Sequence, residues 1–222
     1  MGRTRAALLT PQEAKSLDAR VKGFEMRTGV EVLCVVTPKS DAYPELPWKA
    51  FALGVAVAAL LIVLRDAFDP EWPMAHAVLV PMALALATGA ACAVSVVLVP
   101  AVARLFLHAP TADVEVRTQA KALAVDRGLA GTPRRRALLV LASAFERRMA
   151  GVADIGIAHV VTETAWRDAF HAARAYLARG DMAAALHAAL DVLEPLVTSS
   201  RMQDGEARVN RLADAPLEER AR

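Results

Sequence analysis

The stretch GVEVLCVVTPKSDAYPELPW, residues 29–48, decides the fold, because it joins a β-strand almost directly to a hydrophobic segment. Most residues from Val30 to Val36 are apolar and β-branched, and Gly29 and Pro38 bound them, which is typical of a buried strand. A single strand is not stable, because its backbone donors and acceptors need partners. The partner strands must therefore lie elsewhere in the chain.

Two apolar segments follow the strand, at about residues 48–65 and 74–103. Residues 50–64 and 74–103 contain no Asp, Glu, Lys or Arg, and both segments are long enough to cross a hydrocarbon core of about 30 Å. The polar turn RDAFDPEWP joins them. We therefore predict a transmembrane helical hairpin within residues 48–107, with the glycines 54 and 89 at the contact between its helices.

The Lys and Arg residues indicate the orientation of this hairpin. The turn holds one of them, Arg65, whereas both flanking segments hold many, so both termini are predicted to be cytoplasmic. A net charge of +2 with 5% aromatic residues does not point to a nucleic-acid partner. The expected partners are the lipid bilayer and either another membrane protein or a second copy. Cys34 and Cys92 are expected to be unpaired, small hydrophobic residues.

The soluble segments carry clear helix and strand signals. TPQE at residues 10–13 predicts a capping box, with the helix stopping at Thr28-Gly29. After the hairpin we predict a helix capped by Thr111 or Asp113 and a β-hairpin of strands 137–144 and 149–157. Two further helices should begin after Thr162 and Asp181, and Pro195 should end or kink the second. We expect residues 199–222 to be disordered.

Neither flank could bury a core alone. Together, residues 1–47 and 108–198 supply enough helices and strands for one α/β domain of the α+β type. This domain would be a small mixed sheet covered by helices, interrupted by the transmembrane hairpin. The strand at 30–37 would then pair with the β-hairpin at 137–157.

These segments resemble the TPM domain family. The resemblance lies in LTPQEAKSLDARVKGFEMRTGVEVLCVVTP (9–38), RRALLVLASAFERRMAGVADIGIAHVVTETAWRDAF (135–170) and LARGDMAAALHAALDVLEPL (177–196). YPELPW at residues 43–48 is similar to a bacterial membrane-protein subgroup in which a two-span hairpin splits this domain. The resemblance implies a multi-pass protein of the bacterial cell (inner) membrane that acts as a non-enzymatic interaction or assembly module.

The same resemblance implies an alternative, because some members of the family are described as acid phosphatases or calcium binders. Where such members carry Asp-Asn-Gly before the second strand, this chain has the three arginines 134–136. We therefore leave enzymatic activity open, predict no catalytic residue, and retain Ca²⁺ only as implied by the family.

Candidate site residues follow from the predicted sheet. Asp41, Glu45 and Asp154 could converge at a strand end, and Glu163 lies near Asp154 in the sequence, so Asp41, Asp154 and Glu163 are the candidate metal ligands. They would also serve the alternative function, a metal-dependent phosphatase-like hydrolase. Arg134, Arg135 and Arg136 form a basic group that could contact anionic lipid head groups.

Overall fold

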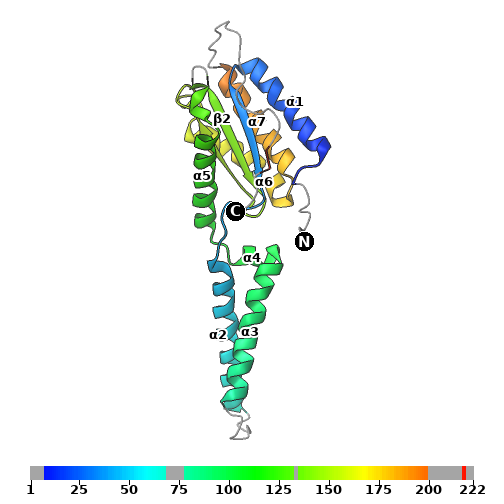
Figure 1. Cartoon of the computed structure of the whole chain (residues 1–222), viewed down its shortest axis with the longest axis vertical. Coiled ribbons are helices and arrows are strands. Elements are labelled where there is room, and N and C mark those ends of the chain that lie inside the picture. The colour runs from blue at the N-terminus through cyan, green and yellow to red at the C-terminus, as the bar shows by residue number, and fades with distance from the viewer. Residues whose placement is uncertain (1–7, 69–77, 133–134, 200–216, 219–222) are drawn as a thin grey trace. The chain divides into compact units, whose positions relative to one another are not determined.

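The computed structural model describes residues 8–68, 78–132, 135–199 and 217–218 (Figure 1). The chain divides into two compact units. The first comprises Met1–Asp41 and Ala109–Arg222, and the second comprises Ala42–His108. The first unit is a mixed α+β domain around a small mixed sheet, which confirms the predicted fold class, and the second is built from helices.

The sheet has the strand order β3-β2-β1-β4. β1 runs parallel to β2, and its register pairs Glu31 with Ala137 and continues to Thr37 with Ser143. β3 is antiparallel to β2, and the two-residue β4 runs parallel to β1. The strand after Gly29 thus finds its partner in the β-hairpin about a hundred residues later. The bounds of the strands are β1 Glu31–Thr37, β2 Ala137–Ser143, β3 Arg148–Ala153 and β4 Leu217–Glu218.

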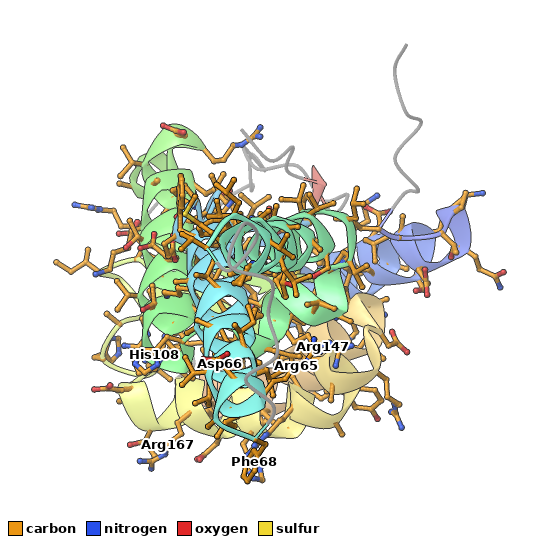
Figure 2. The ribbon with its side chains drawn as sticks, turned by 90° about the horizontal axis from the view of Figure 1, so that it is seen from below. Arg65, Asp66, Phe68, His108, Arg147 and Arg167 are labelled. Carbon is orange, nitrogen blue, oxygen red and sulfur yellow. The ribbon has the colours of Figure 1, made fainter. Side chains whose placement is uncertain are left out.

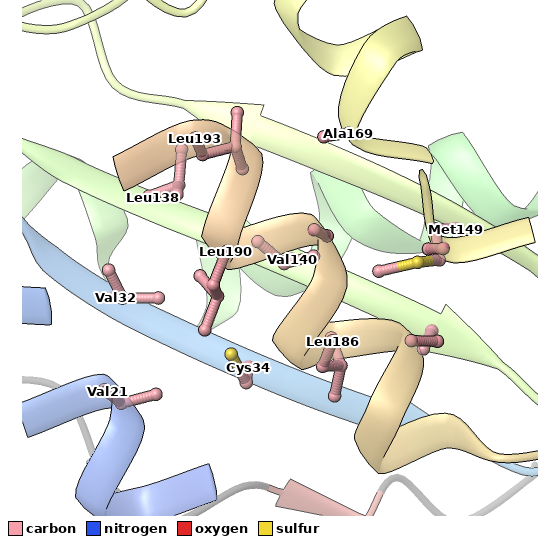
Figure 3. Packing of buried hydrophobic residues seen from close by; sticks show 14 of the residues in the cluster. Val21, Val32, Cys34, Leu138, Val140, Met149, Ala169, Leu186, Leu190 and Leu193 are labelled. Carbon is pink, nitrogen blue, oxygen red and sulfur yellow. The ribbon is translucent and has the colours of Figure 1, made fainter. Parts of the chain in front are cut away.

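Helices cover both faces of this sheet (Figure 1). On one face, α1, α6 and α7 pack on the side chains of Val32, Cys34 and Val36 (Figure 3). On the other face, α5 and the short 3₁₀ helix η2 pack on Leu33 and Val35. The alternation follows from the two-residue period of a strand. The bounds are α1 Pro11–Thr28, α5 Ala109–Asp126, η2 Leu129–Gly131, α6 Glu163–Arg179 and α7 Met182–Ser199.

Most helix ends lie where their capping residues predict. In α1, Glu13 N–H donates to Thr10 Oγ1 at 3.2 Å, and Thr10 N–H donates to Glu13 Oε2 at 2.6 Å, so the predicted capping box is confirmed. Thr162 and Asp181 cap α6 and α7. Gly29 and Gly180 end their helices with positive φ angles of 77° and 83°.

Two predictions about element ends were wrong. α5 begins at Ala109, so neither Thr111 nor Asp113 caps it. β3 ends at Ala153 rather than near Ile157, because Asp154 opens a turn in which its carbonyl accepts hydrogen bonds from the N–H groups of Ile157 and Ala158. Of the two alternatives predicted for Pro195, it does not end α7, which continues to Ser199, and a kink at this residue stays a prediction. The predicted disorder of residues 199–222 falls mostly outside the described residues, although Ser199 ends α7 and β4 is ordered against β1.

The second unit contains α2 Glu45–Phe68, α3 Leu79–Leu98 and the short α4 Pro100–Leu105. α3 stops just before Pro100, which opens α4. α2 and α3 pack through small residues, as the sequence predicted. A Cβ atom added at Gly54 would lie 2.9 Å from Cys92 Sγ, and one added at Gly89 would lie 2.5 Å from Val55 Cγ2.

Candidate functional site

The structure does not bring the predicted acids Asp41 and Asp154 together. Asp41 is exposed in the loop after the carboxyl end of β1. Asp154 follows β3, and its N–H donates to the carbonyl of Ala137 at the amino end of β2. Because β1 and β2 are parallel and seven residues long, these two sheet ends are about 20 Å apart. Glu45 belongs to the second unit.

Asp154 has a local role that explains its burial. Its carboxylate is nearly buried, and Oδ1 accepts a hydrogen bond of 2.7 Å from the N–H of Ile155 and lies 3.3 Å from Arg135 Nη2. Oδ2 is buried without a hydrogen-bond partner. The side chain and carbonyl of Asp154 thus organise the turn that ends β3 and leads toward α6.

Glu163 is exposed at the first position of α6, where a negative charge stabilises the helix dipole. Within residues 8–68, 78–132, 135–199 and 217–218, no group of three or more His, Cys, Asp or Glu side chains could hold a metal ion. The three candidate ligands therefore occupy separate places in the structure.

The predicted basic group precedes β2. Arg134 lies outside the described residues. Arg135 is exposed, with a positive φ of 53°, and the carbonyl of Arg136 accepts a hydrogen bond from Glu31 N–H at 3.1 Å. Arg135 and Arg136 are thus at the amino ends of β1 and β2, and contact of this group with lipid head groups stays a prediction.

A buried polar cluster lies at the opposite end of the sheet, where β1 and β2 end. Glu146, in the turn between β2 and β3, is only 7% exposed. Its Oε1 accepts a hydrogen bond of 2.9 Å from Ser40 N–H, and its Oε2 accepts one from the hydroxyl of the fully buried Ser143. One carboxylate therefore joins the loop after β1 to the end of β2.

The cluster continues to α5 through Thr37. Gln119 Nε2 donates to Thr37 Oγ1 at 3.3 Å, and that hydroxyl donates to the carbonyl of Lys39 at 3.1 Å. Ser40 Oγ and Gln119 Oε1 are buried without a hydrogen-bond partner. The cluster offers oxygen ligands but one carboxylate, which is too few charged ligands for a typical Ca²⁺ site. It is better suited to holding the loop than to binding a divalent cation.

A second contact ties the first residue of β3, directly after this turn, to the segment where the chain re-enters the first unit. Arg148 Nη1 lies 2.6 Å from Asp113 Oδ1, in the second turn of α5. The chain leaves the first unit after Asp41 and returns at Ala109. We call Glu146 and Arg148, with their partners Ser40 and Asp113, the crossing clamp, because they hold both segments that lead to the second unit.

Charged residues also join α1 to α7. Arg20 Nη2 lies 2.7 Å from Asp191 Oδ1 and 2.8 Å from Glu194 Oε2, and Arg27 donates to the other oxygen of Glu194. These bonds, that of Arg27 above all, hold the pKa of Glu194 below its ordinary value. Burial, and then the nearby Arg20, lowers the pKa of His187.

Cys34 is a buried thiol of the sheet. Burial raises its pKa to about 12, so the unreactive protonated form dominates at neutral pH. Cys34 and Cys92 are both free, as expected, and they belong to different units.

The crossing clamp was missed by the sequence analysis. Glu146 lies in a polar hairpin turn, where an acid is usually solvated. The sequence did hold a signal for this contact. Ser143 and Glu146 lie three residues apart at the end of one strand, and the loop Pro38-Lys39-Ser40 follows the strand that is parallel to it. Reading it required the β1–β2 register, since Ser40 and Glu146 are far apart in the sequence.

Comparison with known proteins bears on the fold alone. No family model matches the chain, and no curated protein matches it. Among solved structures, the chain is similar to the NMR structure of BA42 protein from the psychrophilic bacteria Bizionia argentinensis sp. nov., with a TM-score of 0.56 and 11% identity. The match covers 99% of this chain and 100% of that chain. At this identity the likeness extends to the fold, and the TPM resemblance stays a prediction.

Proposed function

We propose that the chain is a membrane-anchored interaction or assembly module of the TPM type. In this proposal α2 and α3 cross the bacterial inner membrane, both termini are cytoplasmic, and the α+β domain binds another membrane protein or a second copy. The α+β domain supplies the binding surface, and the crossing clamp fixes the two segments that lead into the anchor.

The apolar exterior of the helical hairpin carries this proposal. The most apolar windows of α2 and α3 have mean hydropathies of 2.1 and 2.0, and only 11% and 17% of their residues are buried. Large side chains of both helices, such as Leu60, Val63 and Leu86, are exposed. In water such a surface would be unfavourable by about 25 cal/mol per Å² of apolar area, whereas lipid tails solvate it.

The ends and the surface of the hairpin also suit a membrane. Arg65 and Asp66 lie near the end of α2, followed by the exposed Phe68 (Figure 2). An open groove of about 280 Å³ between α2 and α3 is lined by aliphatic side chains together with Thr88 and Arg65. Charged residues at the end of an apolar helix match the boundary between lipid tails and water.

Cysteine labelling tests the anchor and its orientation. Asp69→Cys and Gly205→Cys would be introduced singly and treated with a membrane-impermeant maleimide on intact cells. We expect labelling of the first variant and labelling of the second only after lysis. Recovery of the unmodified chain in the soluble fraction, or labelling of Gly205→Cys on intact cells, would contradict the proposal.

The enzymatic alternative can be tested separately. Purified protein in mild detergent would be assayed on a generic phosphate ester with and without Ca²⁺ or Mg²⁺. We expect no turnover. Metal-dependent turnover that is lost in Asp154→Asn, with an unchanged melting temperature, would instead support a hydrolase. Co-purification of the same membrane protein, or of a second tagged copy, in mild detergent would support the assembly role.

A further inference from the structure

The open groove between α2 and α3 has mainly apolar walls. Its volume is about 280 Å³, and the side chains that line it include Val57, Leu61, Ile62 and Leu84. Thr88 also lines the groove, but its hydroxyl donates to the carbonyl of Leu84 at 2.8 Å, so it has a partner within its own helix. These walls suit an apolar ligand and do not require a polar one.

The two ends of the groove differ. At one end the wall includes Arg65, three residues before the last residue of α2 (Figure 2). At the other end, Val57 and Thr88 lie within one turn of Gly54 and Gly89, where the helices are in close contact. The groove therefore combines apolar walls, a closed end and a positive charge at the other end.

The length of the groove matches one leaflet of a bilayer. From Val57 to Arg65 the wall formed by α2 extends about 12 Å, at 1.5 Å per residue. Half of a hydrocarbon core of about 30 Å measures about 15 Å. A helix of this length occupies roughly 1,000 Å³, because its diameter with side chains is at least about 10 Å. The groove is therefore too small to take up a whole helix and better suited to one acyl chain.

We propose that this groove binds one acyl chain of an anionic phospholipid, whose phosphate contacts Arg65. The guanidinium donates hydrogen bonds to the phosphate oxygens. The acyl chain gains little by leaving the other lipid tails, which are equally apolar, so the charge of Arg65 sets the lipid preference. A zwitterionic head group carries an ammonium beside its phosphate and is attracted less. This inference rests on the proposed membrane anchor.

Native mass spectrometry of the full chain in mild detergent tests this site. Equal amounts of dioleoylphosphatidylglycerol, which is anionic, and dioleoylphosphatidylcholine, which is zwitterionic, would compete for the protein. We expect the wild type to retain one phosphatidylglycerol per chain. Arg65→Gln should lower this occupancy about fivefold, as expected for the loss of one basic contact with an anionic lipid. Lys49→Gln, which removes the same charge near the other end of α2, should leave the occupancy unchanged.

A second pair of variants places the same large side chain inside or outside the groove. Leu60 and Leu61 are equally exposed, at 59% and 60%, but of the two only Leu61 lines the groove. We expect Leu61→Trp to lose the bound lipid and Leu60→Trp to retain it, with similar melting temperatures. Leu84→Trp blocks the groove from α3 and replaces Leu61→Trp if that variant does not fold.

Several results would overturn the proposal. These are equal retention of the two lipids by the wild type, equal occupancy in Arg65→Gln and Lys49→Gln, and equal loss in Leu60→Trp and Leu61→Trp. A dimer without bound lipid that Leu61→Trp dissociates would show that a second copy fills the groove instead. The cysteine labelling described above tests the anchor separately. A membrane-inserted chain without a lipid preference would therefore contradict the lipid site alone.

Discussion

At the scale of single residues, Gly151 shows why a small residue is needed inside β3. A Cβ atom at this position would lie 2.1 Å from the ring of Trp166, which stacks on Phe170 with ring centroids 5.3 Å apart. The glycine therefore lets an aromatic ring of α6 lie directly on the backbone of the strand. This contact fixes α6 on the sheet.

We predict that Gly151→Ala lowers the free energy of unfolding by about 1–3 kcal/mol, because the ring must move or the strand must shift. Gly131→Ala is the matched control, since its added Cβ meets no atom within 4 Å. Thermal and denaturant unfolding in the same detergent would measure both. An equal effect of the two substitutions would show that the Trp166 contact is not the cause.

Glu146 is the second residue whose substitution should have a large effect on stability, although it lies in a turn. We predict that Glu146→Ala costs about 1–3 kcal/mol, because Ser40 N–H and the buried Ser143 hydroxyl lose their acceptor. Glu146→Gln keeps one carbonyl oxygen and should cost less. Denaturant unfolding would compare the variants, and limited proteolysis at the Ser40 loop should be faster for the alanine variant alone.

At the scale of elements, the contact between α1 and α7 should depend on pH. The pKa of Glu194 is lower in the folded chain than its ordinary value of 4.5, so its contribution is fully present above that value and is lost as the pH falls through the folded pKa. The lowered pKa of His187 acts in the same direction from about pH 6.5 downward.

We therefore predict that the free energy of unfolding falls on acidification, with the part due to Glu194 lost as the pH falls below 4.5 and through the lowered pKa of its carboxyl. Glu194→Gln should flatten this part of the profile and cost about 1 kcal/mol at neutral pH, a figure reduced for solvent screening. Asp191→Asn, at the more exposed partner of Arg20, should change the profile less. Denaturant titrations at each pH would measure the three profiles.

The packing of α2 against α3 should depend on the absence of side chains at Gly54 and Gly89. We predict that Gly54→Leu separates the two helices, because even a Cβ atom would lie 2.9 Å from Cys92 Sγ. Ala56→Leu is the matched control on the exposed side of α2. The melting temperature in detergent should fall for Gly54→Leu and stay unchanged for Ala56→Leu. The opposite order would place the contact on another helix face.

Local signals predicted most of these elements, whereas long-range contacts were not predictable. The capping box at Thr10 and the glycine at position 29 depend on residues a few positions apart, so the sequence alone locates α1. The apolar residues after Val152 resemble the continuation of a strand. β3 nevertheless ends at Ala153, because Asp154 begins a turn. The Glu146 cluster depends on Ser40 being brought beside it by the sheet. No local pattern encodes that contact.

At the scale of the whole molecule, the first unit should need both of its chain segments. β1 lies between β2 and β4, and α1 packs on α7, so residues 1–47 supply part of the core from one side of the insertion. We predict that residues 1–47 expressed alone do not fold and that they co-purify with residues 108–222 when both are expressed together.

Circular dichroism of each fragment and affinity purification of the pair would test this prediction. Val32→Asp in the shorter fragment is a suitable control, because Val32 is fully buried in the core on the α1 and α7 face. It should abolish co-purification. Independent folding of residues 108–222 without the shorter fragment would contradict the prediction.

The β1–β2 register also has a consequence for folding during synthesis. Glu31 pairs with Ala137, so β1 leaves the ribosome long before its partner exists. Closing so long a loop costs conformational entropy, and each doubling of loop length adds about 0.6 kcal/mol. Pairing of α2 with α3 draws the ends of the insertion closer and shortens the loop that remains. The sheet of the first unit should therefore close more readily once α2 and α3 have paired than before they pair.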